Sequence, residues 1–256
     1  FTQGMVCHET YKDENNNWLS PDEILPGKEK KYYLKEDPTK LVRVGPPESM
    51  SKSKKNTINP NDIIEKYGAD AVRFFILADS PPEKDIQWSD EGMISSFKFV
   101  QKFWFLSEQV INITKLNPEK QNEELEIFTN QIINKINQAL GKFRYNVMIA
   151  TYHEIYSFFK KVFKNKKNYK NLKYNFEKII LTMLPVIPHI ANECLSELSY
   201  KNDLSWPSID VKYLAKNDKE IVIQINGKKR STIIIENEVS EEKIIEKIKN
   251  KKLIEK

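Results

Sequence analysis

Histidine, cysteine and glycine are scarce in this sequence of 256 residues, which has three His, two Cys and seven Gly. Cys7 and Cys194 form no CxxC pair, and this argues against both a disulfide scaffold and a zinc–thiolate cluster. Glycine and the 12 prolines are together too few for a collagen-like or low-complexity chain. The shortage of cysteine suits a reducing compartment, and we expect a cytoplasmic location.

Long apolar runs are also missing, because each apolar stretch is broken within a few residues by a charge or a proline. The sequence therefore predicts no transmembrane helix, and no signal peptide is visible at its start. Residue 1 is Phe rather than Met. We therefore expect the chain to be part of a longer protein.

Arginine is rare among the basic residues, with 4 Arg against 37 Lys. Arg is the usual choice for bidentate phosphate contacts, and Lys-rich, Asn-rich and Ile-rich composition is typical of a nucleotide bias. Residues 160–178 hold eight Lys and one Glu, a local charge of +7 in a chain of net charge +5. A solvated surface and a nucleic-acid contact both remain open for this run.

The first part of the chain has short β-prone runs rather than helical periodicity. Residues 31–34 and 41–44 predict strands, and the Gly-Pro-Pro at 45–47 is expected to end the second of them. The Leu-Pro-Gly at 25–27 indicates another break in regular structure. We expect a small β-rich region here rather than a full domain.

Helical signals begin at Asn59, which is expected to cap a helix that has Pro60 at its first position and ends at Gly68. A second helix is predicted over 70–79, followed by four apolar stripes with helical spacing. These stripes cover 93–111, 125–140, 148–162 and 172–183, and a shorter helix follows over 188–198. Helices of this length and number predict a bundle, with the aromatic residues of the stripes in its core.

The periodicity changes after Pro207. Isoleucines alternate over 221–225, and Asn226-Gly227 is a strong signal for a two-residue hairpin turn. The return strand is expected over 228–235, and Ser240 is expected to cap a final helix. This pattern predicts a small unit made of a β-hairpin and a helix.

The segment most suggestive of chemistry reads Met-Ser-Lys-Ser-Lys-Lys-Asn over 50–56. Ser51 and Ser53 flank Lys52, and a capped helix follows at Pro60. A polar loop with ammonium groups and small hydroxyls suits a polyanion such as a nucleoside triphosphate, with Lys acting as a point charge. A simple solvated loop is the alternative, because Lys-Ser-Lys is common in Lys-rich chains.

Residues 50–53 resemble the KMSKS loop of class I aminoacyl-tRNA synthetases. The wider segment 50–104, with EKYGADAVR and PPEKDIQWSDEG, resembles the leucyl-tRNA synthetases, as does Gly-Met-Val followed by Glu-Thr-Tyr within 4–11. Residues 184–193 are similar to that family's helical anticodon-binding-type domain, and 221–230 are similar to its small C-terminal tRNA-contacting domain. The resemblance runs through nearly the whole chain in order.

This resemblance implies a mainly α fold with a small α+β part. Residues 1–90 would be the end of a catalytic domain with the KMSKS-like loop, 91–207 an antiparallel helical bundle, and 208–256 a small tRNA-contacting domain. The implied function is ATP-dependent activation of leucine and its transfer to tRNA-Leu, with Mg²⁺ accompanying ATP. The nucleotide-binding half, leucine pocket and editing domain of the family would precede residue 1, so the chain alone is expected to be inactive.

The family's functional residues carry over position by position. Lys52 matches the Lys that binds the ATP phosphates and is the implied catalytic residue, while Met50 would lie toward the adenine. Ser51 and Ser53 match the small hydroxyl positions of the ATP-binding loop. The implied tRNA contacts are Lys228, Lys229 and Arg230, beside the hairpin turn.

One position departs from the motif, because its first Lys is Ser49 in this chain. That change removes a phosphate or loop contact, for which Lys54 and Lys55 would be the available electrostatic substitutes. His189, at a predicted helix start, and Trp88 are expected to be structural, Trp88 as a packing anchor beside the bundle.

Two other functions stay open at this point. If the protein truly begins at Phe1, a non-catalytic tRNA-binding module is the alternative to a leucine–tRNA ligase. A synthetase for isoleucine, valine or methionine is disfavoured by the text of 4–11 and 81–92.

Overall fold

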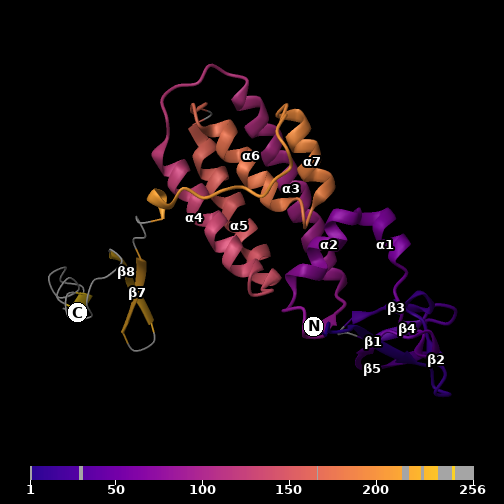
Figure 1. The fold of residues 1–256 in the computed structure, drawn as a ribbon. Coiled ribbons are helices and arrows are strands. Elements are labelled where there is room, and N and C mark those ends of the chain that lie inside the picture. The colour runs from indigo at the N-terminus through magenta and orange to yellow at the C-terminus, as the bar shows by residue number, and fades with distance from the viewer. Residues whose placement is uncertain are drawn as a thin grey trace.

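The computed structural model describes residues 2–28, 31–165, 167–214, 219–225, 228–235 and 244–245. A small curled sheet comes first, a helical bundle forms the middle, and a two-stranded hairpin follows a long linker (Figure 1). In this view the sheet and the hairpin lie on opposite sides of the bundle. The prediction of a mainly α fold with a small α+β part is confirmed.

The sheet has the strand order β2-β1-β5-β4-β3, and β6 pairs in parallel with β1. Its strands are β1 (Val6–Lys12), β2 (Trp18–Leu19), β3 (Ile24–Pro26), β4 (Tyr32–Leu34), β5 (Leu41–Ser49) and β6 (Ile86–Gln87). Buried Tyr11, Leu19, Ile24 and Val42 form a small core of its own. Apolar side chains that come together across four strands hold this sheet together.

Two expectations about this region are wrong. The Gly-Pro-Pro at 45–47 does not end the strand, because β5 continues to Ser49. The register shifts between His8 and Thr10, so that two prolines face one residue of β1. Such a bulge places proline where no ladder N–H is needed. The expected break at 25–27 is also partly strand, since Pro26 ends β3 and that strand lies at the edge of the sheet.

Two short helices connect the sheet to the bundle. Helix α1 (Pro60–Tyr67) begins as predicted, with the side chain of Asn59 accepting a hydrogen bond from the Asn61 N–H. Gly68 ends it at φ +80 and also precedes α2 (Ala69–Ala78). An L-residue rarely adopts this backbone conformation, so glycine fixes a sharp corner between the two helices.

The bundle consists of α3 (Asp90–Thr114), α4 (Glu123–Leu140), α5 (Tyr145–Val162), α6 (Leu172–Met183) and α7 (Pro188–Glu197). All four predicted stripes are helical, and most of their apolar residues lie in one large buried cluster to which α2 also contributes. Phe74 of α2 stacks on Phe99 of α3 with the ring centroids 4.5 Å apart. Helix α2 is therefore part of the bundle core.

Backbone hydrogen bonds also join the sheet to the loop before the bundle. Gly4 N–H donates to the Pro82 carbonyl at 2.8 Å, and Trp88 N–H donates to the Cys7 carbonyl at 2.7 Å. A Cβ at Gly4 would overlap the backbone of Lys84, so this close approach requires glycine. Trp88 is buried and meets Phe75 edge-on at 5.3 Å, which agrees with its expected role as a packing anchor.

The C-terminal strands are β7 (Lys219–Ile225) and β8 (Lys228–Ile235), which pair antiparallel as predicted. The predicted turn at Asn226-Gly227 and the helix cap at Ser240 lie outside the described residues, although Ile244 and Ile245 are helical. In the described part of the chain, no helix has the length and apolar character that crossing a membrane requires.

Candidate ATP-phosphate loop and tRNA-binding elements

The 50–56 loop leaves the sheet at the end of β5 and leads to α1. Met50 N–H donates to the Val6 carbonyl at 3.1 Å, which extends the pairing with β1 by one step. Residues Lys52–Lys54 then form a single 3₁₀ turn, η3, and the Ser51 hydroxyl caps it by accepting from the Lys54 N–H at 3.3 Å. The Ser51 and Ser53 hydroxyls lie 3.3 Å apart. The loop is thus folded onto itself.

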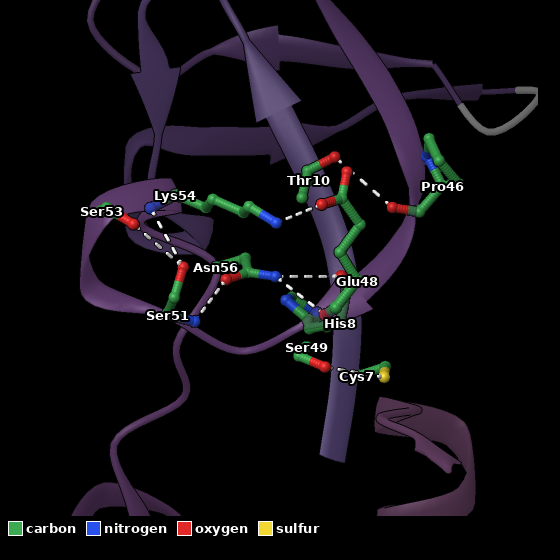
Figure 2. Close-up of polar contacts among 10 residues, drawn as sticks. All are labelled: Cys7, His8, Thr10, Pro46, Glu48, Ser49, Ser51, Ser53, Lys54 and Asn56. Carbon is green, nitrogen blue, oxygen red and sulfur yellow. Dashed lines mark hydrogen bonds and ion pairs between the residues drawn. The ribbon is translucent and has the colours of Figure 1, made fainter. Parts of the chain in front are cut away.

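Asn56 anchors this loop to the sheet (Figure 2). Its side chain is fully buried, and its Oδ1 accepts from the Ser51 N–H at 2.9 Å. Its Nδ2 donates to the carbonyls of His8, at 3.2 Å, and Glu48, at 3.1 Å. One amide therefore ties together the first residue of the turn, the last part of β5 and β1. All three bonds are to backbone atoms, so they fix the path of the chain.

The three lysines of the loop differ in their surroundings. Lys54 forms an ion pair with Glu48, and Lys55 lies 3.4 Å from a carboxylate oxygen of Glu23. Lys52 is exposed, and among the described residues its ammonium group has no ion-pair or hydrogen-bond partner. The charges that were candidates to replace the motif's first Lys are therefore directed to carboxylates, and Lys52 alone is left to meet an anion.

Ser49, at the position of the motif's first Lys, is the last residue of β5 and pairs with Cys7. Its hydroxyl lies 4.0 Å from the Cys7 sulfur, a weak contact at most. The side chain at this position contributes no charge to the loop. The loop therefore offers one unpaired ammonium group together with the hydroxyls of Ser51 and Ser53, a set that suits phosphate oxygens.

Lys228, Lys229 and Arg230 are the first three residues of β8. They belong to a separate two-stranded sheet, which Figure 1 shows away from the 50–56 loop. The structure does not bring the two groups of predicted site residues together. If both act on one nucleic-acid substrate, they must contact distant parts of it.

The Lys-rich run over 160–178 is largely matched by acidic residues. Lys161, Lys167 and Lys173 lie within 3.7, 3.1 and 3.8 Å of carboxylates, from Glu124, Glu119 and Glu177 respectively. Lys178 is buried, and burial lowers its pKa. These contacts favour the solvated-surface interpretation of this run, since a nucleic-acid face would leave its cations unpaired.

The histidines are structural where the structure describes them. His153 packs against Phe99 with ring centroids 4.3 Å apart, and burial lowers its pKa. His189 lies at the start of α7 with Nδ1 2.8 Å from Asp70, in keeping with the expected structural role. In the described ranges no three His, Cys, Asp or Glu side chains come together as a metal site.

Comparison with known proteins places these elements in one family. Residues 38–89 match the family model of class I tRNA synthetases for isoleucine, leucine, methionine and valine, and 122–246 match that of the anticodon-binding domain of tRNA ligase. The leucine–tRNA ligase of Rickettsia bellii is 38% identical over 95% of this chain, and that of a Wolbachia from Culex pipiens is 36% identical over 95%. The chain belongs to the leucyl-tRNA synthetase family. It spans 29% of the length of each of these two relatives.

A solved leucyl-tRNA synthetase shares the fold. The LeuRS of Agrobacterium radiobacter K84, crystallised in a ternary complex with tRNA and LeuAMS, superposes with a TM-score of 0.60 over 78% of this chain and 27% of its own. At 24% identity this likeness concerns the fold alone. The first family model includes the whole 50–56 loop, and the second covers α4 to β8.

Sequence reasoning missed three residues that hold this part of the synthetase together. Asn56 closes the basic run without any periodic signal, and its role depends on β1, almost fifty positions earlier. Asp70 and Arg73 read as ordinary polar residues of a short helix, yet they bond to the turn before α7. Only contacts between distant segments reveal these roles, so no local pattern could have indicated them.

Proposed function

We propose that this chain is part of a leucine–tRNA ligase in which the 50–56 loop holds the phosphates of ATP. One observation carries the proposal. Lys52 is the only lysine of this loop without a carboxylate partner among the described residues, and Asn56 fixes the backbone that presents it. Sequence identity of 38% to a leucine–tRNA ligase supports leucine as the amino acid.

In the first reaction, the carboxylate oxygen of leucine attacks the α-phosphorus of ATP. The bond from that phosphorus to the bridging oxygen breaks, pyrophosphate leaves with the electron pair, and leucyl-adenylate forms. Negative charge grows on the leaving oxygens, and the Lys52 ammonium is the group of this loop that stabilises it. Lys52 acts electrostatically and forms no covalent bond with the substrate.

In the second reaction, a hydroxyl of the terminal ribose of tRNA attacks the leucyl carbonyl and AMP leaves. The match of 122–246 to an anticodon-binding domain supports tRNA as the partner of the bundle and the hairpin. Lys228, Lys229 and Arg230 lie within that match and supply cationic groups for phosphates of the tRNA. Mg²⁺ would be carried in by ATP, since no cluster of metal ligands occurs in the described ranges.

The test is Lys52→Ala in the full-length enzyme, measured as leucine-dependent ATP–pyrophosphate exchange. We expect the rate to fall by roughly 10²–10³-fold, the scale of losing one preorganised contact to the transition state. Affinity for leucine should change little, because Lys52 faces phosphate oxygens in this proposal. Lys55→Ala is the matched control, since it removes the same charge from the same loop at a residue already paired with Glu23.

An exchange rate for Lys52→Ala within about threefold of wild type would contradict the assignment. So would an equal loss in Lys55→Ala, because the effect would then come from the net charge of the loop. A loss confined to Lys52 supports a specific contact with the phosphates.

A second candidate is a tRNA-binding protein without ligase activity. It is favoured by the extent of the anticodon-binding match, which covers 122–246, about half of the chain. The two candidates differ in the gene, because a reading frame that continues upstream of Phe1 into a HIGH-type signature supports the ligase. A start codon close to Phe1 supports the binding protein.

A further inference from the structure

Asp70, in the first turn of α2, caps a helix that lies far away in the sequence. Its carboxylate accepts from the backbone N–H of Ile190 at 2.8 Å and of His189 at 3.3 Å, and it contacts His189 Nδ1 at 2.8 Å. Helix α7 has no side-chain cap of its own at Ile187. A buried carboxylate needs such donors, and the first turn of a helix has N–H groups without partners. Asp70 satisfies both needs.

Arg73 holds the other side of the same turn. Its Nε donates to the Val186 carbonyl at 3.0 Å, and one terminal nitrogen donates to the Pro185 carbonyl at 2.5 Å. Two residues one helical turn apart on α2 thus bond to the donors and acceptors of 185–190. We call this set of contacts between α2 and the turn 185–190 the α2–α7 clamp.

The clamp lies at one end of a short, well-defined path to the 50–56 loop. Helix α2 begins at the Gly68 corner, and α1 precedes it with its cap at Asn59. Asn59 follows the loop anchor Asn56 by only three residues. Because capped helices and a single glycine corner make up this path, movement of the turn 185–190 is passed to the loop with little room for slack.

We propose that Asp70 and Arg73 are positioning residues that couple the tRNA-binding bundle to the 50–56 loop. This inference rests on the proposed function, and it adds the means by which tRNA held on the bundle acts at the ATP site. Neither residue touches ATP or the reacting atoms. Their effect is expected in the tRNA-dependent step, where the bundle and the loop must be held in register, rather than in amino-acid activation without tRNA.

The experiment compares two reactions of the full-length enzyme in the variants Asp70→Asn and Arg73→Met. Asp70→Asn keeps the shape of the side chain, and Arg73→Met keeps an aliphatic stem while removing the donors. We expect kcat/KM for tRNA in aminoacylation to fall by about tenfold, within the usual range of coupling between sites. ATP–pyrophosphate exchange without tRNA should stay within about twofold, with rates normalised to the adenylate burst.

The control is Glu154→Gln, which breaks the 2.6 Å ion pair between Lys135 and Glu154 inside the bundle. It should change neither reaction. An equal fall in both reactions, or no change in either, would overturn the coupling role and leave a structural one. Should Asp70→Asn not fold, Arg73→Met decides the question, since Arg73 lies on the exposed face of α2.

Lys52→Ala in the same assays keeps the two proposals apart. If Lys52→Ala leaves exchange unchanged, the proposed role of the loop fails, whatever the clamp variants do. If Lys52→Ala abolishes exchange while the clamp variants show no split between the two reactions, only the coupling inference fails.

Discussion

Replacement of Asn56 by Ala tests whether one buried amide holds the 50–56 loop in shape. The substitution removes the bond from the Ser51 N–H and the two bonds to the carbonyls of His8 and Glu48. It changes none of the charges of the loop and leaves Lys52 in place. Any effect on phosphate binding must therefore come from the position of the loop.

The magnitude follows from the three lost bonds. A typical hydrogen bond contributes about 1 kcal/mol net, and a buried group left without a partner costs about 1–3 kcal/mol. Ser51 and Glu48 are only partly buried, so water can reach part of the gap. We therefore expect the loop to open with a free energy lower by about 3 kcal/mol, which is about two orders of magnitude in population.

The assay is native-state hydrogen exchange at the Ser51 amide, which donates directly to Asn56. Its protection factor should fall by about 10²-fold in Asn56→Ala, whereas amides in the middle of α4 should keep theirs. Asn59→Ala is the matched control, because Asn59 caps α1 in the same region but makes no bond to the loop. It should cost about 1 kcal/mol of helix stability without exposing the Ser51 amide.

Asn56→Asp gives a sharper test, because it changes the sign of one half of the side chain. A carboxylate can still accept from Ser51, but its second oxygen would face the carbonyls of His8 and Glu48. Burying a charge against two acceptors is costly, so Asp should destabilise the loop more than Ala at pH 7, and less at a pH that protonates it. Equal protection of Ser51 in wild type and Asn56→Ala, or an Asp variant milder than Ala at pH 7, would refute the anchor.

Two further predictions concern charge. Neutralising Lys228, Lys229 and Arg230 should weaken tRNA binding and flatten its salt dependence between about 50 and 200 mM, as filter binding would measure, whereas neutralising the carboxylate-paired Lys161, Lys167 and Lys173 should do little. Equal effects of the two triple variants would count against a tRNA contact at the hairpin. Burial lowers the pKa of His8 and His153 below the ordinary value of 6.5, so the unfolded chain takes up protons first, and the free energy of unfolding should fall as the pH drops below about 6.5. Urea titrations from pH 5 to 8 on wild type and on His8→Gln/His153→Gln should show a flatter profile for the variant, and an unchanged profile would contradict the shifts.

The helices could be predicted from the sequence because their signals are local. Pro60 after Asn59 and the apolar stripes of the bundle specify start, face and end within a few residues, and the structure agrees with each. The sheet was harder, since β5 continues through the Gly-Pro-Pro that was expected to end it. Only the bulge opposite, on β1, makes those prolines acceptable, and pairing between strands about 35 residues apart leaves no local trace.

The candidate site divides in the same way. Lys52 was found from its resemblance to a known motif, and its charge and flanking hydroxyls are consistent with that role. Asn56, Asp70 and Arg73 could not be found, because each acts on backbone groups of a segment far along the chain. A polar side chain that bonds to backbone atoms needs no particular partner residue, so the partner sequence contains no matching signal.

The partners of the lysines also decide which of them is available to ATP. In a chain with 37 Lys, composition alone gives no reason to prefer one of them. Within the 50–56 loop, however, Glu48 takes Lys54 and Glu23 takes Lys55, and both carboxylates belong to the sheet region that also receives Asn56. The sheet thus holds the loop through one amide and two ion pairs. Exposed ion pairs contribute little to stability, so their larger effect here is to keep two cations away from the phosphates and leave the approach to Lys52.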